Sequence, residues 1–163
     1  MNEAAREQEV FLASQQEIPG TRFDYPDKCI DVLAVADAML AGELECRRGY
    51  IELVFKHLRT SIKLDDALRY SEPWAWMQPS RHAYCALLME QDRMEEAVKH
   101  YADDLAVTKT FPCGTQHPLN FWALHGYHEC LNRPGRAEEA RVVGCRRVIR
   151  TFDCWLSTKC PLS

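Results

Sequence analysis

Hydrophobic and polar residues recur with helical spacing along most of the chain, and this pattern predicts an all-α protein. The first helix is expected at about 3–17, where Ile18-Pro19-Gly20 ends it, and an extended stretch follows as far as Asp27. Six further helices are expected at about 29–48, 50–66, 78–91, 93–107, 119–132 and 136–152.

These later helices are arranged as pairs that are joined by short turns. Gly49, Asp92 and Gly135 occupy equivalent turn positions, and 43 residues separate each from the next. A fixed internal period of this kind indicates a repeat architecture. The pattern of helix, turn and helix recurs in AMLAGELECRRGYIELVFKHL, HAYCALLMEQDRMEEAVKHYA and LHGYHECLNRPGRAEEARVVG.

Small residues follow each turn at a fixed distance. Val54, Ala97 and Ala140 stand five residues after the three turn positions. Two packed helices approach closely only where the side chains between them are small. We therefore expect these three residues at the contact between the paired helices.

The paired segments resemble tetratricopeptide repeats, whose usual period is about 34 residues. The additional residues here fall in the connections DDALRYSEPWAWMQPS and TKTFPCGTQHPLN, which should be structured. More narrowly, AMLAGELECRRG, EPWAWMQPSRHA and HPLNFWALHGYHECL resemble a group of bacterial and fungal repeat proteins, over about residues 30–145. The resemblance implies three stacked TPR-like repeats with an N-terminal helix and a C-terminal cap. It carries no catalytic residues over.

The chain has 163 residues, the size of one ordinary domain, and we expect one cooperative unit. Residues 1–27 would form an N-terminal helix and extended lead-in, and residues 28–153 the TPR-like domain. The tail at 154–163 would either cap the last repeat or be disordered.

The resemblance also indicates where a ligand would bind, because the first helix of each pair lines the concave side of such an array. The tetratricopeptide groove positions map onto Met39, Glu43, His82, Ala86, Trp122, His125 and Glu129.

The chemistry of these positions suggests a polar site. His82 and His125 lie one repeat of 43 residues apart, and Glu129 follows His125 by one helical turn. Together with Glu43 they could bind a divalent metal such as Zn, Mn, Fe or Cu, or act as an acid and base pair. The alternative is that these histidines are hydrogen-bonded structural residues or peptide contacts.

Aromatic and thiol groups leave similar alternatives open. Trp74, Trp76 and Trp122 stand near the starts of inner helices, where they would either pack in the core or wall a ligand pocket. Additional candidate ligands are Cys113, His117, His128 and Cys130, whereas the wide spacing of Cys154 and Cys160 fits a compact thiolate site poorly.

Charge and composition limit the range of partners. The formal net charge is −4 with both signs interspersed, so nucleic acid is not an expected partner. No apolar run approaches the roughly 20 residues needed to span a bilayer, and the charged N-terminus MNEAAREQEV does not match a signal peptide. We expect a cytoplasmic protein without membrane contact. Its eight cysteines contain no CxxC pair and should be reduced thiols.

Two classes of function remain. The first is a groove that binds a small molecule or metal through the His and Glu cluster, and this site could support acid-base or metal-assisted catalysis. The second is a peptide-binding interaction module without catalysis. Groove positions occupied by His, Glu, Met, Ala and Trp do not suit recognition of a carboxylate, which favours Lys and Arg. The sequence does not decide between an enzyme and a binding module, and it does not predict an oligomeric state.

Overall fold

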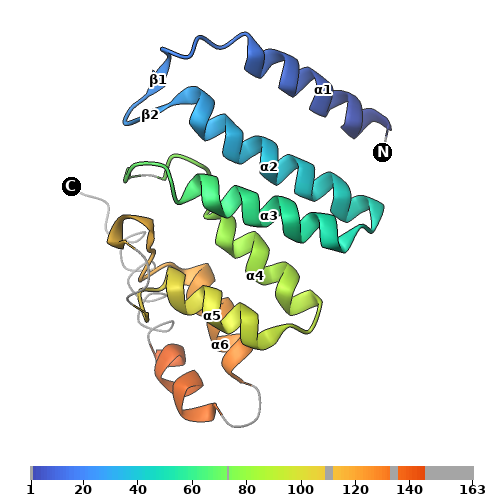
Figure 1. The fold of residues 1–163 in the computed structure, drawn as a ribbon. Helices are drawn as coiled ribbons and strands as arrows, with labels where there is room; N and C mark the ends of the chain where they lie inside the picture. Colours follow the sequence, from blue (N-terminus) through green and yellow to red (C-terminus); the bar gives the residue numbers. More distant parts are fainter. Residues whose placement is uncertain (1, 73, 109–111, 133–135, 146–163) are drawn as a thin grey trace, which may run out of the picture. The chain divides into compact units, whose positions relative to one another are not determined.

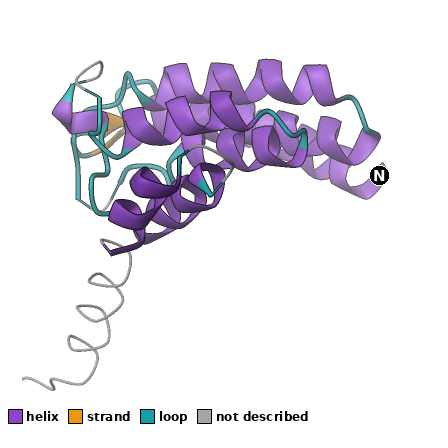
Figure 2. Ribbon diagram, turned by 90° about the horizontal axis from the view of Figure 1, so that it is seen from below, coloured by secondary structure: helices purple, strands orange, loops and turns teal. Residues whose placement is uncertain are grey.

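Helices account for nearly all of the regular structure in the computed structural model, which describes residues 2–72, 74–108, 112–132 and 136–145. The all-α prediction is confirmed: Figure 2 shows helices almost throughout, with one short pair of strands. The helices labelled in Figure 1 are α1 (Asn2–Gln16), α2 (Cys29–Arg48), α3 (Ile51–Asp65), α4 (Ser80–Glu90), α5 (Met94–Asp104) and α6 (Phe121–Leu131). Cys113–Thr115 form a single 3-10 turn, and residues 137–145 are also helical.

Most helix ends lie within two residues of their predicted positions, and two differences have clear causes. The fifth helix was expected to reach residue 107, but α5 ends at Asp104 because Ala106 adopts a left-handed backbone conformation, with φ 57°. The stretch before α2 is not simply extended. It folds back as a hairpin of β1 (Phe23–Asp24) and β2 (Asp27–Lys28), with Phe23 opposite Lys28.

The chain divides into two compact units, Met1–Tyr84 and Cys85–Ser163, and the boundary falls within α4. This division does not test the predicted domain boundaries at 27/28 and 153/154, which stay predictions. The expected C-terminal cap lies outside the described residues.

The first unit is built around the antiparallel pair of α2 and α3. Figure 1 shows α1, α2 and α3 lying side by side, and α2 contacts both neighbours. Val35 of α2 and Phe55 of α3 are almost completely buried. Phe55 also meets Tyr84 edge-on, with ring centroids 5.6 Å apart, so the first residues of α4 complete this core.

The second unit contains the packed pair α5 and α6. Tyr101 of α5 is buried against α6 at Gly126, where the absence of a side chain leaves room for the phenol ring. The N-terminus of α6 is capped by Asn120, whose side-chain oxygen accepts hydrogen bonds from the backbone N–H groups of Trp122 and Ala123. This cap fixes the start of the helix that carries three of the predicted site residues.

The turns at Gly49 and Asp92 have the same geometry, 43 residues apart. Both residues have positive φ, 81° at Gly49 and 57° at Asp92. The same pair of hydrogen bonds closes both helices: Gly49 N–H to Cys46 O and Tyr50 N–H to Glu45 O, then Asp92 N–H to Met89 O and Arg93 N–H to Leu88 O. This pattern is the Schellman motif. The third predicted turn position, Gly135, lies outside the described residues.

The small residues after the turns are also equivalent. Val54, Ala97 and Ala140 are 3%, 0% and 3% exposed. Each donates its backbone N–H to the carbonyl four residues earlier, and these acceptors are Tyr50, Arg93 and Arg136. The 43-residue alignment of the sequence therefore corresponds to equivalent burial and equivalent hydrogen bonding at these positions.

The connection between α3 and α4 is fixed by polar contacts at both of its ends. Ser61 and Ser80 are fully buried, and their hydroxyl oxygens lie 2.8 Å apart. Asp65 accepts the backbone N–H of Ser80 at 2.9 Å. The buried guanidinium of Arg81 donates two hydrogen bonds of 2.6 Å to the carboxylate of Asp66. These contacts agree with the expectation that this connection is structured.

The connection between α5 and α6 is held in an equivalent way. Asp104 stands 43 residues after Ser61 and is also buried. Its carboxylate lies 2.8 Å from Nδ1 of His117, and its carbonyl accepts the backbone N–H of His117 at 2.6 Å. The buried polar residue at this repeat position therefore anchors, in both cases, the chain that leads into the next helix.

Candidate functional site

The predicted site residues are divided between the two units. Glu43 and His82 belong to the first unit, on α2 and α4. His125 and Glu129 belong to the second unit, and both lie on α6. The structure therefore brings together one half of the predicted His and Glu cluster within a single helix.

An aromatic and polar face is exposed on α6, and we call Phe121, Trp122, His125 and Glu129 the α6 face. Trp122 is 70% exposed. The His125 ring stacks on Phe121 with centroids 6.3 Å apart, and Phe121 meets Trp122 edge-on at 5.4 Å. Nε2 of His125 lies 3.5 Å from a carboxylate oxygen of Glu129. A little more than two turns of helix thus present an aromatic surface beside an imidazole and a carboxylate.

Exposure at the mapped groove positions repeats along the chain. In α2, α4 and α6, two mapped positions lie four residues apart; the earlier residue is half-buried and the later one is exposed. The half-buried residues are Met39, His82 and His125, and the exposed residues are Glu43, Ala86 and Glu129. The residues of each set lie 43 residues apart, so the exposure of these side chains repeats with the period of the sequence.

The first-unit residues have contacts of their own. Glu43 is exposed, and Arg47, one turn later, donates a 3.1 Å hydrogen bond to its carboxylate. The backbone N–H of His82 donates to the carbonyl of Pro79 at 2.9 Å, within the first turn of α4. Exposed pairs of this kind contribute little stability, so the carboxylate of Glu43 remains accessible to a ligand.

The three predicted tryptophans differ in their surroundings. Trp122 and Trp74 are exposed, so neither is a core residue. Trp76 is half-buried, and its indole N–H is buried without a hydrogen-bond partner among the described residues. Burying a hydrogen-bond donor without an acceptor costs free energy, and Trp76 is the one of the three tryptophans that bears this cost.

No metal centre is formed by the part of the chain that the structure describes. Within it, no three His, Cys, Asp or Glu side chains gather closely enough to hold an ion. Metal binding by His82, His125, Glu43 and Glu129 therefore stays a prediction. Two of the other candidate ligands take part in the packing of the second unit: the imidazole of His117 contacts the carboxylate of Asp104, and Cys130 is buried.

Four ionisable groups of the second unit have pKa values shifted from their ordinary values, and two of them are buried tyrosines. Burial raises the pKa of the Tyr101 phenol far above its usual value, and the nearby thiols of Cys85 and Cys130 raise it further. Burial also raises the pKa of Tyr127. On the surface, the hydrogen bond from Arg136 lowers the pKa of Glu139. None of these shifts marks an acid or a base at the candidate site.

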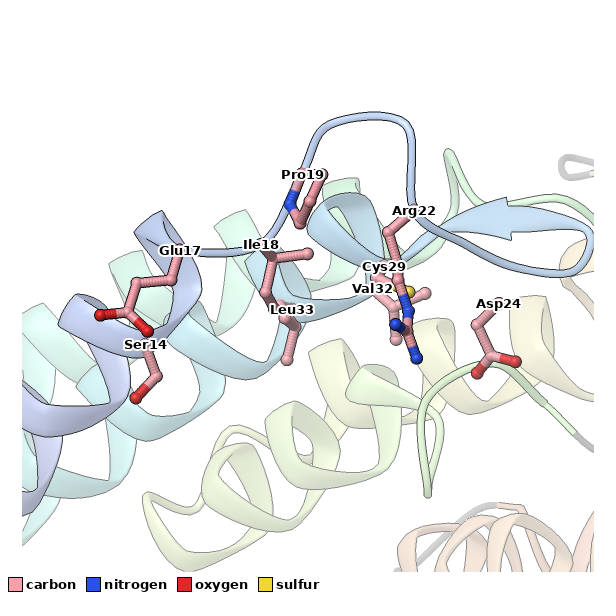
Figure 3. Close-up of a pocket in the computed structure, with 9 residues that line it drawn as sticks. All are labelled: Ser14, Glu17, Ile18, Pro19, Arg22, Asp24, Cys29, Val32 and Leu33. Carbon is pink, nitrogen blue, oxygen red and sulfur yellow. The ribbon is translucent and has the colours of Figure 1, made fainter.

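A pocket in the first unit was not predicted from the sequence. It has a volume of about 490 Å³ and lies where the end of α1, the chain before β1 and the start of α2 meet (Figure 3). Its lining comprises Ser14, Glu17, Ile18, Pro19, Arg22, Asp24, Cys29, Val32 and Leu33. The sequence predicts only an extended lead-in at residues 18–27, and the mixture of Arg22 with apolar neighbours is the one signal there of a binding surface.

Comparisons with protein-family models, with curated proteins and with solved structures found no match. The resemblance to tetratricopeptide repeats therefore rests on the sequence alone and stays a prediction. Within the described ranges, no helix has the length and apolar character required to cross a membrane.

Proposed function

We propose that the chain is a TPR-like binding module whose α6 face binds a peptide segment with a basic residue beside apolar residues. The observation that carries the proposal is the α6 face, where the 70% exposed Trp122 stands one turn from His125 and two turns from Glu129. An exposed aromatic cluster costs solvation free energy unless a partner covers it, and such clusters commonly mark binding surfaces.

The charge of the partner follows from the residues at the mapped positions. Glu129 is exposed on α6, and this helix contains no Lys or Arg. A carboxylate and an indole that are exposed on the same helix favour a cationic ligand, through charge and through attraction to the aromatic ring. A lysine or arginine that packs along Trp122 and reaches Glu129 would use both groups.

A pair of labelled peptides of equal length provides the test. One would alternate lysine with leucine and the other glutamate with leucine, and binding would be followed by fluorescence anisotropy. The basic peptide should bind and the acidic peptide should not. Trp122→Ala and Glu129→Gln should each weaken binding by about tenfold, the effect of losing one aromatic or charge-assisted contact of about 1.4 kcal/mol.

Matched controls separate the α6 face from general surface effects. Tyr50→Ala removes an exposed aromatic ring at the turn before α3, and Glu138→Gln removes an exposed carboxylate near Arg141. Both control variants should bind the basic peptide as the wild type does. Equal binding of the two peptides, or equal losses in site and control variants, would contradict the proposal.

A second candidate is a divalent metal site or acid and base pair at His125 and Glu129, possible because these side chains lie 3.5 Å apart. Two ligands on one turn leave positions for further ligands, and Zn, Mn, Fe(II) and Cu are the ions to test. The metal content of purified protein, before and after chelation, and the change in thermal stability on adding each ion would test it. Metal-free protein that no ion stabilises would exclude this candidate.

A further inference from the structure

The pocket of the first unit has an apolar centre. Ile18 and Pro19 come from the chain after α1, and Val32 and Leu33 come from the first two turns of α2. Figure 3 shows Ile18 close to Leu33, with Pro19 above them. The hydrogen bond from Cys29 N–H to the carbonyl of Arg22, 3.0 Å long, holds the chain before β1 against the start of α2. A volume of about 490 Å³ lies within the usual range for small-molecule sites.

Charges of both signs surround this apolar centre. Arg22 extends its guanidinium toward Val32 and Cys29 in Figure 3, with Asp24 beside it and Glu17 at the opposite end. The side chains of these three charged residues make no hydrogen bond or ion pair with other residues in the described part of the chain. A guanidinium has five N–H donors in a planar fork that suits a carboxylate. Each carboxylate is an acceptor suited to an ammonium group.

We propose that this pocket binds a small zwitterion with an apolar body, of the chemical class of aliphatic amino acids. The ligand carboxylate would accept hydrogen bonds from Arg22, and its ammonium group would bind Asp24. The aliphatic side chain would cover Ile18 and Leu33 and remove their apolar surface from water. The site is carried by residues 14–33, so it stands independently of the function proposed for the α6 face.

The thiol of Cys29 provides a local reporter of occupancy. Cys29 lines the pocket, whereas Cys46, at the other end of α2, does not, and both thiols are half-buried. We would measure the rate of alkylation of each thiol by iodoacetamide, using peptide mass spectrometry, with L-leucine as the probe. Leucine should slow alkylation of Cys29 severalfold and leave the rate at Cys46 unchanged. Equal rates at Cys29 with and without leucine would overturn the proposal.

Two analogues of leucine test the need for both charges. Isocaproate lacks the amine, and isoamylamine lacks the carboxylate, while both keep the branched aliphatic chain. Each should require about a tenfold higher concentration than leucine for the same protection of Cys29, because one charge-assisted contact is lost. Protection by either analogue at the concentration that suffices for leucine would overturn the assignment of a zwitterion.

Variants of the charged residues complete the test. Arg22→Gln and Asp24→Asn should each raise the leucine concentration required for protection by about tenfold. Arg6→Gln, which changes an exposed arginine on α1 outside the pocket, is the matched control and should behave as the wild type. A helical circular dichroism spectrum would confirm that each variant is folded. Wild-type protection in both pocket variants would overturn the proposal.

Discussion

The hydroxyl oxygen of Tyr101 lies so close to the α-carbon of Gly126 that a methyl group added there would be 2.2 Å from it. Two further atoms of the ring would lie within 2.9 Å of the same methyl group. We expect Gly126→Ala to lower the free energy of unfolding by about 1–3 kcal/mol, because the helices must separate or the ring must move. Urea unfolding followed by circular dichroism would measure the change.

Gly42 provides the matched control for this substitution. A methyl group added there would lie 3.5 Å from the nearest atom, the β-carbon of His57, which is an ordinary contact. Because alanine favours a helix over glycine by about 1 kcal/mol, Gly42→Ala should be neutral or stabilising. Equal destabilisation by Gly42→Ala and Gly126→Ala would show that the contact with Tyr101 is not the cause.

The repeat alignment predicts that Ala97 and Ala140 cannot be enlarged. Both are buried at equivalent positions after a turn, so leucine at either should cost about 1–3 kcal/mol through overpacking. Ala86→Leu is the control, since Ala86 is an exposed residue of α4. Thermal unfolding of the three variants would compare them, and unchanged stability in both buried variants would show that the alignment is wrong.

Tyrosine burial predicts a loss of stability in alkaline solution. The pKa of Tyr101 is raised in the folded state, so the unfolded chain loses its phenolic proton first as the pH rises. The contribution of the protonated Tyr101 to the free energy of unfolding is therefore complete below about pH 10, the ordinary pKa of tyrosine. This contribution falls as the pH rises above that value. Tyr101→Phe should reduce the slope of unfolding free energy against pH in this range. An identical slope in wild type and variant would contradict the assignment.

Five of the cysteines should react in an order set by their exposure. Cys145 is exposed, Cys29 and Cys46 are half-buried, and Cys85 and Cys130 are buried. In native protein we expect iodoacetamide to modify Cys145 first and the two buried thiols last. Under denaturing conditions without reductant, most of the eight cysteines should be modified. Four intact disulfides in that experiment would instead indicate an oxidising compartment.

The sequence predicted the helices and turns well because their signals are local. Gly49 tolerates positive φ freely, and Asp92 is one of the few other residue types that accept it. Ala106 also adopts positive φ, but alanine favours a right-handed helix and does not predict this conformation. The sequence therefore predicts an end of α5 that is too late. The hairpin of β1 and β2 was missed because strands of two residues are too short to show an alternating pattern.

The candidate site was less predictable because it depends on contacts between elements. Helical spacing is sufficient to place His125 and Glu129 on one face, and the structure has them there. Spacing along one helix does not indicate which side chains of different helices lie close together. The cluster of Glu43, His82, His125 and Glu129 therefore remains a prediction. The pocket beside Arg22 arises where the chain folds back onto α1 and α2, and a linear pattern carries no signal for such a fold.

The paired anchors Ser61 with Ser80 and Asp104 with His117 decide where this chain could be cut into interchangeable blocks. A block that ended within a connection would separate a buried hydroxyl or carboxylate from its partner. A block that runs from turn to turn, from Tyr50 to Asp92, keeps Ser61 and Ser80 together and contains 43 residues. An engineer who wished to lengthen the array should therefore duplicate that segment, inserting the copy immediately after Asp92.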